Sequence, residues 1–290
     1  IAPRINAMGR LGSALDALRA LCTKDPKKSL DLMQKLNDTN TQRQELTWST
    51  VELAIKKTKE QKEEHLVIVS SPEYHEGVIG LIAGKLMEEF YRPAIAISIG
   101  EKMAKASARS IPGVNIVELI RQVRDDLLDV GGHPMAAGFS LLPEKVEMVT
   151  QRLFELAKKE IDEQSLKPSL PVECELPFGL ANLNLINMLK SFEPFGNGNP
   201  DPVFGLKNLQ ILQVYALGKE KKHLKLVVSD ADANTGQSLE CIAFGKGKRE
   251  AELQQAKSIH LAGTIGVNEW NGKKSVQLVV KDLGVTPSAD

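Results

Sequence analysis

Residues 93–110 read PAIAISIGEKMAKASARS, and this stretch decides the fold class of the first half of the chain. Its two apolar runs, Pro93–Ile99 and Met103–Ser110, flank a glycine-containing turn, which predicts two consecutive strands. Further strands are predicted on either side, at His65–Ser70 and Ala136–Leu142. Predicted helices alternate with these strands, at 77–90, 114–130 and 143–164. Strands that alternate with helices predict an α/β layered domain.

Two helices are predicted before this domain. Ser13–Cys22 carries apolar residues at helical spacing, and Asp25-Pro26 then marks a break because proline suits the first turn of a new helix. From there to about Lys62 the sequence is polar, with apolar residues at roughly helical intervals. Such a long, solvated helix is typical of a strut between domains.

The pattern changes after Leu166–Pro171, which has the composition of a linker. A helix at Leu180–Ser191 is followed by a Gly/Asn/Pro loop, which we interpret as a structural connection, and then by short strands. Five strands are predicted at 204–217, 223–229, 238–244, 258–267 and 275–280. One helix is predicted before the last two of these strands. This order predicts a small closed barrel of the OB type.

Composition excludes several classes of protein. The 290 residues are 42% hydrophobic and 26% charged, which suits two globular domains. Lys plus Arg equals Asp plus Glu at 37 each, so binding of a polyanion must depend on local clusters. No apolar run of 18 residues occurs, which argues against a membrane span. Three widely spaced cysteines favour a reducing cytosol, and the opening at Ile1 without a methionine suggests a fragment of a longer protein.

The sharpest local motif is GGHPMAAG at 131–138. Gly131 and Gly132 let the backbone approach a ligand closely, and His133 can donate a hydrogen bond to an oxyanion. The alternative is that the glycines end the preceding helix and the histidine is incidental. The eight residues alone leave both interpretations open.

Arginines beside small or hydroxyl residues form two other candidate phosphate sites. Arg109 stands between Ser107 and Ser110 at the end of a predicted strand, and guanidinium and hydroxyl groups together suit an oxyanion. A solvated surface arginine is the alternative, favoured when the motif is taken in isolation. Asn6 and Arg10 lie among small residues that could grip a phosphodiester or form a surface loop.

Glycines also punctuate the helix that follows YHEG at 74–77. Those at 77, 80 and 84 leave one helix face nearly without side chains, so another backbone can pack there or a phosphate can approach. Spacing alone favours close packing. His75 and Glu76 resemble a capping pair as readily as a proton relay.

In the predicted barrel, basic residues gather in turns. Lys219, Lys221, Lys222 and His223 cluster in one turn. Lys246, Lys248 and Arg249 cluster in another. Trp270 precedes an Asn-Gly hairpin signal that continues into Lys273. Basic turns beside an aromatic side chain are typical of single-strand binders, whereas solvated turns around a core Phe244 are the alternative.

No cluster of carboxylates and histidines able to hold two divalent cations is evident, and no nucleophile, P-loop or dinucleotide motif occurs. Taken in order, the motifs closely resemble those of the RecJ exonucleases of the DHH phosphoesterase superfamily. The resemblance is carried by PRINAMGR, LNDTNTQRQEL, YHEGVIGLIAGKL, FYRPAIAIS, SARSIPG, GGHPMAAGF, PFGNGNPDPVF, HLKL and NEWNGKKSVQLVVKD.

The resemblance implies degradation of single-stranded DNA from the 5′ end in repair and recombination, with Mn²⁺ or Mg²⁺ held by a DHH domain. The aspartate motifs of that domain are absent from this sequence, so the fragment alone is expected to be inactive and to bind no metal. The implied segments are the end of the DHH domain, a helical connector, the DHH-associated α/β domain and the OB domain, at 1–12, 13–64, 65–167 and 168–290.

By the same resemblance, His133 contacts the scissile phosphate together with Gly131 and Gly132. Ser107 and Arg109, with Ser110 and His75 nearby, bind the 5′-phosphate or adjacent backbone. The remaining implied contacts are Asn6 and Arg10 near the cleft floor, and Trp270, Lys221, Lys222, His223 and Lys273 in the barrel.

The implied partners are single-stranded DNA with a 5′ end, a single-stranded-DNA-binding protein and a helicase, with no membrane. We expect a monomer in the bacterial cytoplasm, associated with the nucleoid. Two alternatives stay open: a phosphodiesterase for oligoribonucleotides or cyclic dinucleotides in the same superfamily, and a non-catalytic DNA-binding scaffold. The barrel and the PFGNGNP loop argue against the former, since small substrates do not require them.

Overall fold

The computed structural model describes residues 1–61, 64–218, 220–231 and 236–286, and at Trp270 it describes the backbone alone. The chain divides into two compact units, Ile1–Pro168 and Ser169–Asp290. Each unit has its own apolar core. Within the described residues, no helix has the length and apolar content needed to cross a membrane.

The first unit begins with three helices, α1 (Ala2–Leu11), α2 (Ala14–Cys22) and α3 (Pro26–Lys59). The long helix α3 has 34 residues and so measures about 51 Å. Asp25 caps it, because its carboxylate accepts hydrogen bonds from the backbone N–H groups of the first turn. The surface loop considered for the Arg4–Arg10 segment is wrong, since this segment lies in α1, where Met8 is buried against α2 and α3.

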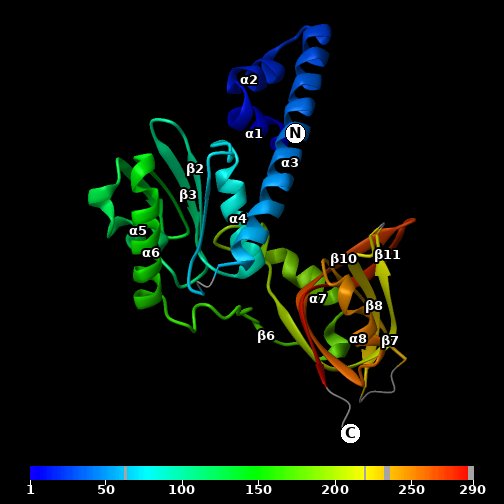
Figure 1. The fold of residues 1–290 in the computed structure, drawn as a ribbon. Helices are drawn as coiled ribbons and strands as arrows, with labels where there is room; N and C mark the ends of the chain where they lie inside the picture. Colours follow the sequence, from blue (N-terminus) through cyan, green and yellow to red (C-terminus); the bar gives the residue numbers. More distant parts are fainter. Residues whose placement is uncertain (62–63, 219, 232–235, 287–290) are drawn as a thin grey trace. The chain divides into compact units, whose positions relative to one another are not determined.

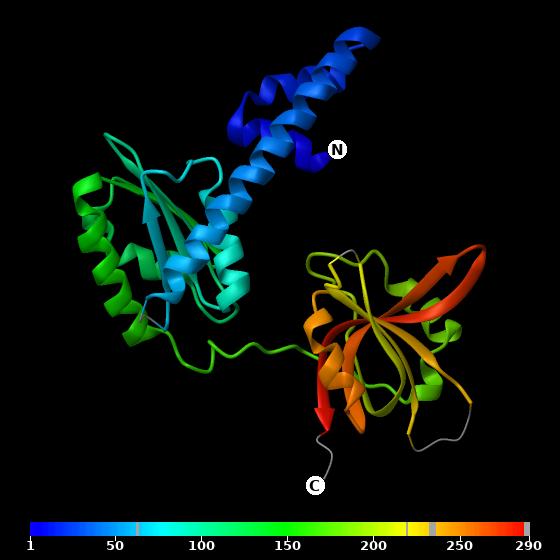
Figure 2. The same ribbon diagram turned by 45° about the vertical axis from the view of Figure 1, so that its right-hand side comes forward.

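The α/β layer is a five-stranded sheet in the order β1-β2-β3-β5-β4. Only the β1–β2 pair is parallel. Helices α3 and α4 pack on one face and α5 and α6 on the other (Figures 1 and 2). The elements are β1 (Val67–Ser71), α4 (Ile79–Phe90), β2 (Ala94–Ile99), β3 (Ala104–Arg109), α5 (Ile116–Arg121), β4 (Asp129–His133), β5 (Ala136–Leu141) and α6 (Val146–Glu160), with 3-10 turns η1 (Arg124–Asp126) and η2 (Pro143–Lys145).

The predicted helix over 114–130 is wrong in its second half. Helix α5 ends at Arg121, and the chain passes through η1 into β4, which pairs with β5 as a hairpin. Val130 packs against the core of the sheet while its neighbours face away, which is the period-two pattern of a strand. The idea that Gly131 and Gly132 end a helix is therefore also wrong, because both belong to β4.

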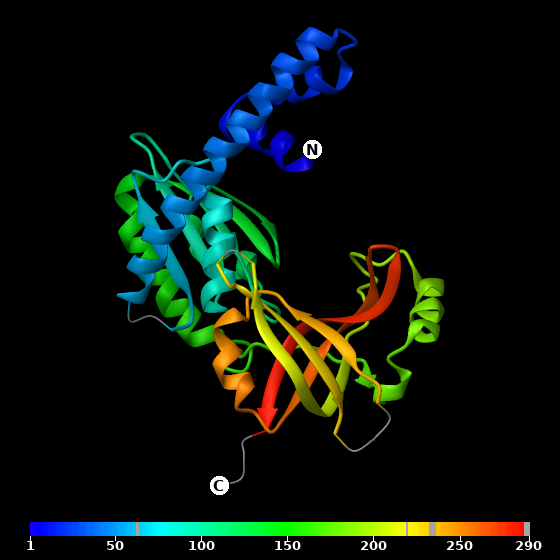
Figure 3. The ribbon, with the colours of Figure 1, turned by 90° about the vertical axis from the view of Figure 1, so that its right-hand side faces the viewer.

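The second unit is a closed barrel, which confirms the predicted OB domain (Figure 3). Its strands follow the order β7-β8-β9-β11-β10, and an additional β10–β7 pairing closes the ring. The pair β9–β11 is parallel and the other ring pairs are antiparallel. The barrel strands are β7 (Phe204–Leu217), β8 (His223–Asp230), β9 (Leu239–Ala243), β10 (Ser258–Trp270) and β11 (Lys273–Thr286).

Short elements surround the barrel. The two-residue strand β6, which the sequence did not predict, pairs with the start of β7, and α8 lies between β9 and β10 as expected. These elements are β6 (Cys174–Glu175), η3 (Phe178–Leu180), α7 (Leu183–Leu189), η4 (Lys190–Phe192), η5 (Gly247–Arg249) and α8 (Glu250–Gln254).

Candidate nucleic-acid-binding site

Three antiparallel strands bring two separate motifs onto one face of the α/β sheet. Strand register places Ser107 opposite Gly138, and Gly138 opposite Gly131. In the next row along the strands, Ala136 lies between Arg109 on one side and His133 on the other. A third row at the other end completes what we call the open face, composed of Lys105, Ser107, Arg109, Ser140, Gly138, Ala136, Asp129, Gly131 and His133.

The open face is polar on the flanking strands and nearly without side chains in the middle. Ala104, Ala106 and Ala108 of β3 point into the core, so the residues between them must point to the open face. The central strand β5 contributes only serine, glycine and alanine there. A Cβ at Gly131 would meet no atom within 4 Å, so backbone is bare at that point. The result is a shallow trough between two columns of functional groups.

Arg109 is held at one edge of this trough. Its Nη1 donates to the backbone oxygen of Ala108 at 2.7 Å and to Ser107 Oγ at 3.1 Å. A Cβ at Gly80 would lie 3.0 Å from Arg109 Nη2 and 3.2 Å from Ser107 Oγ. Glycine in the first turn of α4 therefore leaves the space that the guanidinium occupies. No side chain caps this helix, whose N-terminus carries a partial positive charge.

Arg10 reaches the same cavity from α1. Its Nη1 donates to the backbone oxygen of Gly77 at 3.3 Å, and a Cβ at Gly77 would lie 2.1 Å from the backbone oxygen of Arg10. Burial, and secondly the nearby charge of Arg10, lower the pKa of the Arg109 guanidinium. Two cations that repel each other gain from an anion bound between them. Arg10, Ser107 and Arg109 thus line one cavity of about 430 Å³, the anion pocket.

Two exposed histidines make the same kind of hydrogen bond to the backbone. His133 Nδ1 accepts the backbone N–H of Met135 at 3.3 Å, and His75 Nδ1 accepts that of Gly77 at 3.0 Å. An Nδ1 acceptor leaves Nε2 to carry the proton in the neutral ring, so each Nε2–H can donate outward. His133 is two strands from Arg109 in one row, about 10 Å away. His75 is outside the lining of the anion pocket.

Gly132 has a structural role that Gly131 does not share, and neither Ser110 nor Asn6 lines the anion pocket. Gly132 has φ +145°, and a Cβ there would lie 2.4 Å from the backbone oxygen of Ala136, so the hairpin requires glycine. Ser110 is 1% exposed and its Oγ donates to the backbone oxygen of Val114 at 2.7 Å, so this hydroxyl serves the fold. Asn6 is exposed on α1 and does not line the pocket.

In the barrel, two basic turns that are distant in sequence form one surface. The backbone N–H of Gly247 donates to the oxygen of Lys222 at 3.0 Å, and a Cβ at Gly247 would lie 1.9 Å from the oxygen of Lys221. Lys248 is exposed beside them. Part of the positive charge is compensated, because Lys222 pairs with Glu220 and Lys246 pairs with Asp282 at 3.7 Å.

An exposed aromatic ring lies at this basic surface. The interpretation of Phe244 as a core residue is wrong, since it is 57% exposed. Its ring meets that of His223 edge to face at 5.3 Å, and His223 Nδ1 accepts the N–H of Gly245 at 3.0 Å. The sequence held a signal for this, because Leu239, Cys241 and Ala243 point inward and period two turns the next residue outward. Phe244 is therefore a candidate for base stacking that the sequence motifs missed.

Among the other predicted barrel residues, Lys273 does not join this surface. Lys273 is exposed at the start of β11, whereas Phe244 follows the end of β9, which runs parallel to β11. From the register the two are separated by roughly 26 Å along the strands, and Figure 3 shows the β10–β11 hairpin and the start of β8 on opposite sides of the barrel. Lys219 and the side chain of Trp270 lie outside the described residues.

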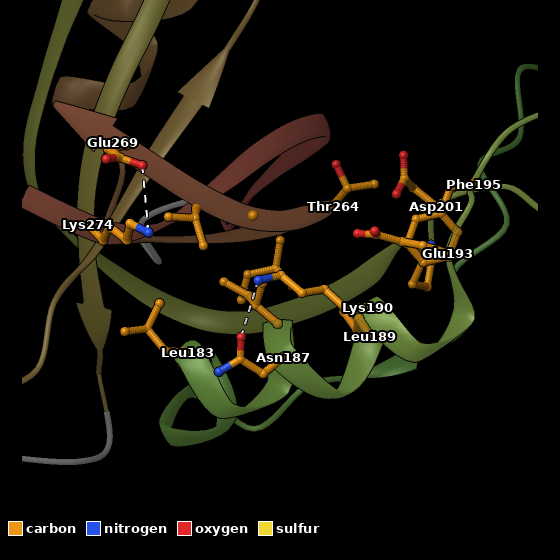
Figure 4. A pocket seen from close by; sticks show the side chains of 15 residues that line it. Leu183, Asn187, Leu189, Lys190, Glu193, Phe195, Asp201, Thr264, Glu269 and Lys274 are labelled. Carbon is orange, nitrogen blue, oxygen red and sulfur yellow. Dashed lines mark hydrogen bonds and ion pairs between the residues drawn. The ribbon is translucent and has the colours of Figure 1, made fainter. Parts of the chain in front are cut away.

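The PFGNGNP loop lines a second cavity, of about 550 Å³, between α7 and the β10–β11 hairpin (Figure 4). Asn199 Nδ2 holds the loop by donating to the backbone oxygens of Phe192 and Pro194, at 2.8 and 3.0 Å. Around the cavity, cationic Lys190 and Lys274 alternate with carboxylates such as Glu193. This mixture of charges does not favour one sign of ligand.

Comparison with known proteins defines the class to which this fold belongs. Residues 63–159 match the DHHA1 domain family, and residues 172–282 match the RecJ OB domain family. A DHHA1 domain followed by this OB domain is the scaffold of single-strand-specific exonucleases of the RecJ type.

The relatives identify the family. The chain is 33% identical over 291 residues to the single-stranded-DNA-specific exonuclease RecJ of Bacillus subtilis and 31% identical over 286 residues to that of Thermus thermophilus. The crystal structure of Thermus thermophilus RecJ in complex with Mn²⁺ superposes with a TM-score of 0.80 at 29% identity, covering 99% of this chain. The chain thus carries a RecJ OB domain and is similar over nearly its whole length to exonucleases of the RecJ family. It spans 36% and 39% of the two relatives and 41% of the crystallised chain.

The metal ions of this family do not fit the residues described here. A protein centre that holds Mn²⁺ or Mg²⁺ gathers oxygen or imidazole ligands around one point, and carboxylates are the usual source of the oxygens. Among residues 1–61, 64–218, 220–231 and 236–286, no group of three or more His, Cys, Asp and Glu side chains could hold a metal ion. The described residues therefore supply no metal centre for hydrolysis.

Proposed function

We propose that this chain is the substrate-binding portion of a RecJ-type exonuclease that degrades single-stranded DNA in the 5′→3′ direction, in DNA repair and recombination. The observation that carries the proposal is the convergence of Arg10, Ser107 and Arg109 beside the N-terminus of α4. Two guanidiniums, a hydroxyl and a helix N-terminus suit a phosphate dianion, the form that a 5′-terminal phosphate takes.

The open face extends this pocket by about one nucleotide step. A 5′-phosphate bound at Arg109 places the following nucleotide over the trough of β5, where Gly138 and Gly131 present bare backbone. The next phosphate then approaches His133, whose outward Nε2–H can donate to a phosphate oxygen. Fixing the end and the scissile bond together contributes positioning to hydrolysis. The metal-bound chemistry belongs to residues outside those described.

The barrel supplies a second contact for the incoming strand. Lys221 and Lys248 face solvent beside the exposed ring of Phe244. Ammonium groups bind phosphates without regard to sequence, and an aromatic face stacks on any base. The barrel is thus proposed to hold single-stranded DNA while the anion pocket holds its 5′ end. A single-stranded-DNA-binding protein and a helicase are proposed partners of the monomeric enzyme in the bacterial cytoplasm, at the nucleoid.

Fluorescence anisotropy tests this proposal. A 3′-labelled, 5′-phosphorylated single strand is titrated with the 290-residue chain at several salt concentrations, and blunt duplex serves as competitor. We expect salt-sensitive binding that the duplex does not displace, and a loss of roughly tenfold in Arg109→Ala. Arg124→Ala removes an exposed arginine elsewhere on the same unit and should change little. Equal affinity of wild type and Arg109→Ala for the phosphorylated strand would refute the proposed site.

The purified chain is also expected to lack nuclease activity, because its described residues hold no metal cluster. Incubation with a 5′-phosphorylated strand and Mn²⁺, followed by chromatography of the products, measures this. Mn²⁺-dependent release of 5′-mononucleotides would contradict the assignment of the chain as a substrate-binding portion.

A further inference from the structure

The anion pocket is cationic at one end only. Lys105, Ser140 and Asp129 form the row of the open face that follows the row of Ser107, about 7 Å farther along the strands. Asp129 and Glu76 both line the pocket at this end. The two guanidiniums thus share one cavity with two carboxylates, an arrangement that a simple phosphate-binding site does not need.

The single cation at this end is already engaged. Lys105 Nζ lies 2.6 Å from Glu76 Oε2, and both side chains are about half exposed. This hydrogen bond lowers the pKa of the Glu76 carboxyl, so Glu76 is ionised at neutral pH. Asp129 is exposed on β4 with its side chain on the open face. Two carboxylates and one ammonium give this end of the pocket a net negative charge. We call the two acidic residues, Glu76 and Asp129, the carboxylate wall.

We propose that the carboxylate wall makes the pocket selective for a strand end carrying a single phosphate, and that Asp129 is the main specificity-determining residue. This proposal rests on the proposed function, because it assumes that Arg109 and Ser107 bind the terminal phosphate. A 5′-triphosphate adds two phosphates beyond the first, and this extension is comparable in length to the step of about 7 Å from the row of Ser107 to the row of Lys105, Ser140 and Asp129. Asp129 is the member of that row on β4, two strands from Ser107, and it lines the same cavity as Arg109. The added charges would meet the wall, and like charges at short range disfavour binding.

The alternative path for the extra phosphates is also blocked. On the side of α4, the guanidinium of Arg109 occupies the space next to Gly80, with its Nη2 3.0 Å from the position that a Cβ at Gly80 would take. On the side of α1, the backbone of Arg10 packs directly against Gly77. A β- and γ-phosphate that stay within the pocket therefore either pass Glu76 and Asp129 or displace the first phosphate from Arg109. Either outcome weakens binding, although a more highly charged ligand ordinarily binds a basic site more tightly.

Three 3′-labelled DNA oligonucleotides of one sequence test the proposal, with a 5′-hydroxyl, a 5′-monophosphate or a 5′-triphosphate. Their affinities for the 290-residue chain are measured by anisotropy at low salt. We expect the monophosphate to bind most tightly and the triphosphate more weakly. In Asp129→Asn the triphosphate should gain about tenfold in affinity, whereas the monophosphate should change less than about twofold. Asp162→Asn removes another exposed carboxylate, which lies outside the pocket, and should leave the preference intact.

Each outcome assigns a cause. If wild type binds the triphosphate as tightly as the monophosphate, or if Asp129→Asn leaves their ratio unchanged, the carboxylate wall does not determine specificity. If in addition Arg109→Ala binds the monophosphate as well as wild type does, the pocket itself is misassigned and the proposed function fails. A ratio that changes in Asp129→Asn while Arg109→Ala loses the monophosphate supports both.

Discussion

The fit between Gly80 and Arg109 makes a sharp prediction, because helix α4 contains a second glycine one turn later. A Cβ at Gly84 would meet no atom within 4 Å, whereas a Cβ at Gly80 would lie 3.0 Å from Arg109 Nη2 and 3.2 Å from Ser107 Oγ. Gly80→Ala and Gly84→Ala therefore make the same chemical change on the same helix. Only the former is expected to disturb the anion pocket.

The magnitudes follow from helix propensity and hydrogen bonding. Alanine stabilises a helix interior by about 1 kcal/mol relative to glycine, so Gly84→Ala should raise the free energy of unfolding by about that amount. In Gly80→Ala the gain is offset by displacement of the Arg109 side chain, which is flexible, so stability should stay close to wild type. The displaced guanidinium loses a hydrogen bond to a charged phosphate, worth about 1.5–3 kcal/mol. Affinity for a 5′-phosphorylated strand should then fall roughly ten- to a hundredfold.

Urea unfolding followed by circular dichroism measures the first quantity, and anisotropy with the phosphorylated strand measures the second. A 5′-hydroxyl strand serves as a ligand control, since its affinity should differ little between the two variants. The reasoning is refuted if Gly80→Ala and Gly84→Ala bind the phosphorylated strand equally well. It is also refuted if Gly84→Ala loses affinity as strongly as Gly80→Ala.

Three variants and one thiol reagent test the remaining assignments. Gly132→Ala should destabilise the first unit by about 1–3 kcal/mol, since its Cβ would meet the backbone at 2.4 Å, whereas Gly131→Ala should unfold like wild type in urea and bind DNA less tightly. Phe244→Ala should leave thermal unfolding nearly unchanged and weaken binding of a long single strand by about 1–3 kcal/mol per stacked base, without altering the preference for a 5′-phosphate. Burial raises the pKa of the Cys241 thiol to about 12, so a thiol reagent at pH 8 should titrate the two exposed cysteines in the native chain and reach Cys241 only after unfolding; prompt reaction of three thiols would contradict this.

Local pattern was sufficient for most elements and for both domains. Apolar runs on either side of a glycine-containing turn located β2 and β3, the predicted helices at 77–90 and 143–164 correspond to α4 and α6, and Asp25-Pro26 marked the start of α3. These features depend on neighbours within a few residues, which is the range over which periodicity and capping act. The same reasoning failed at β4, where Val114–Val130 has a helical pattern but its end pairs with β5. Pairing with a partner strand outweighed local propensity there.

The sequence by itself determined which chemical groups the protein carries: Arg109 beside hydroxyls, His133 after two glycines, and basic turns in the barrel. Only the tertiary structure decided which of them meet. Strand register sets Arg109 in the row of His133, and the close approach at Gly77 brings Arg10 to the same pocket from 67 residues away. It also buried Ser110 and exposed Phe244. Such contacts join residues far apart in the chain, and their geometry depends on register and packing that no local window of sequence contains.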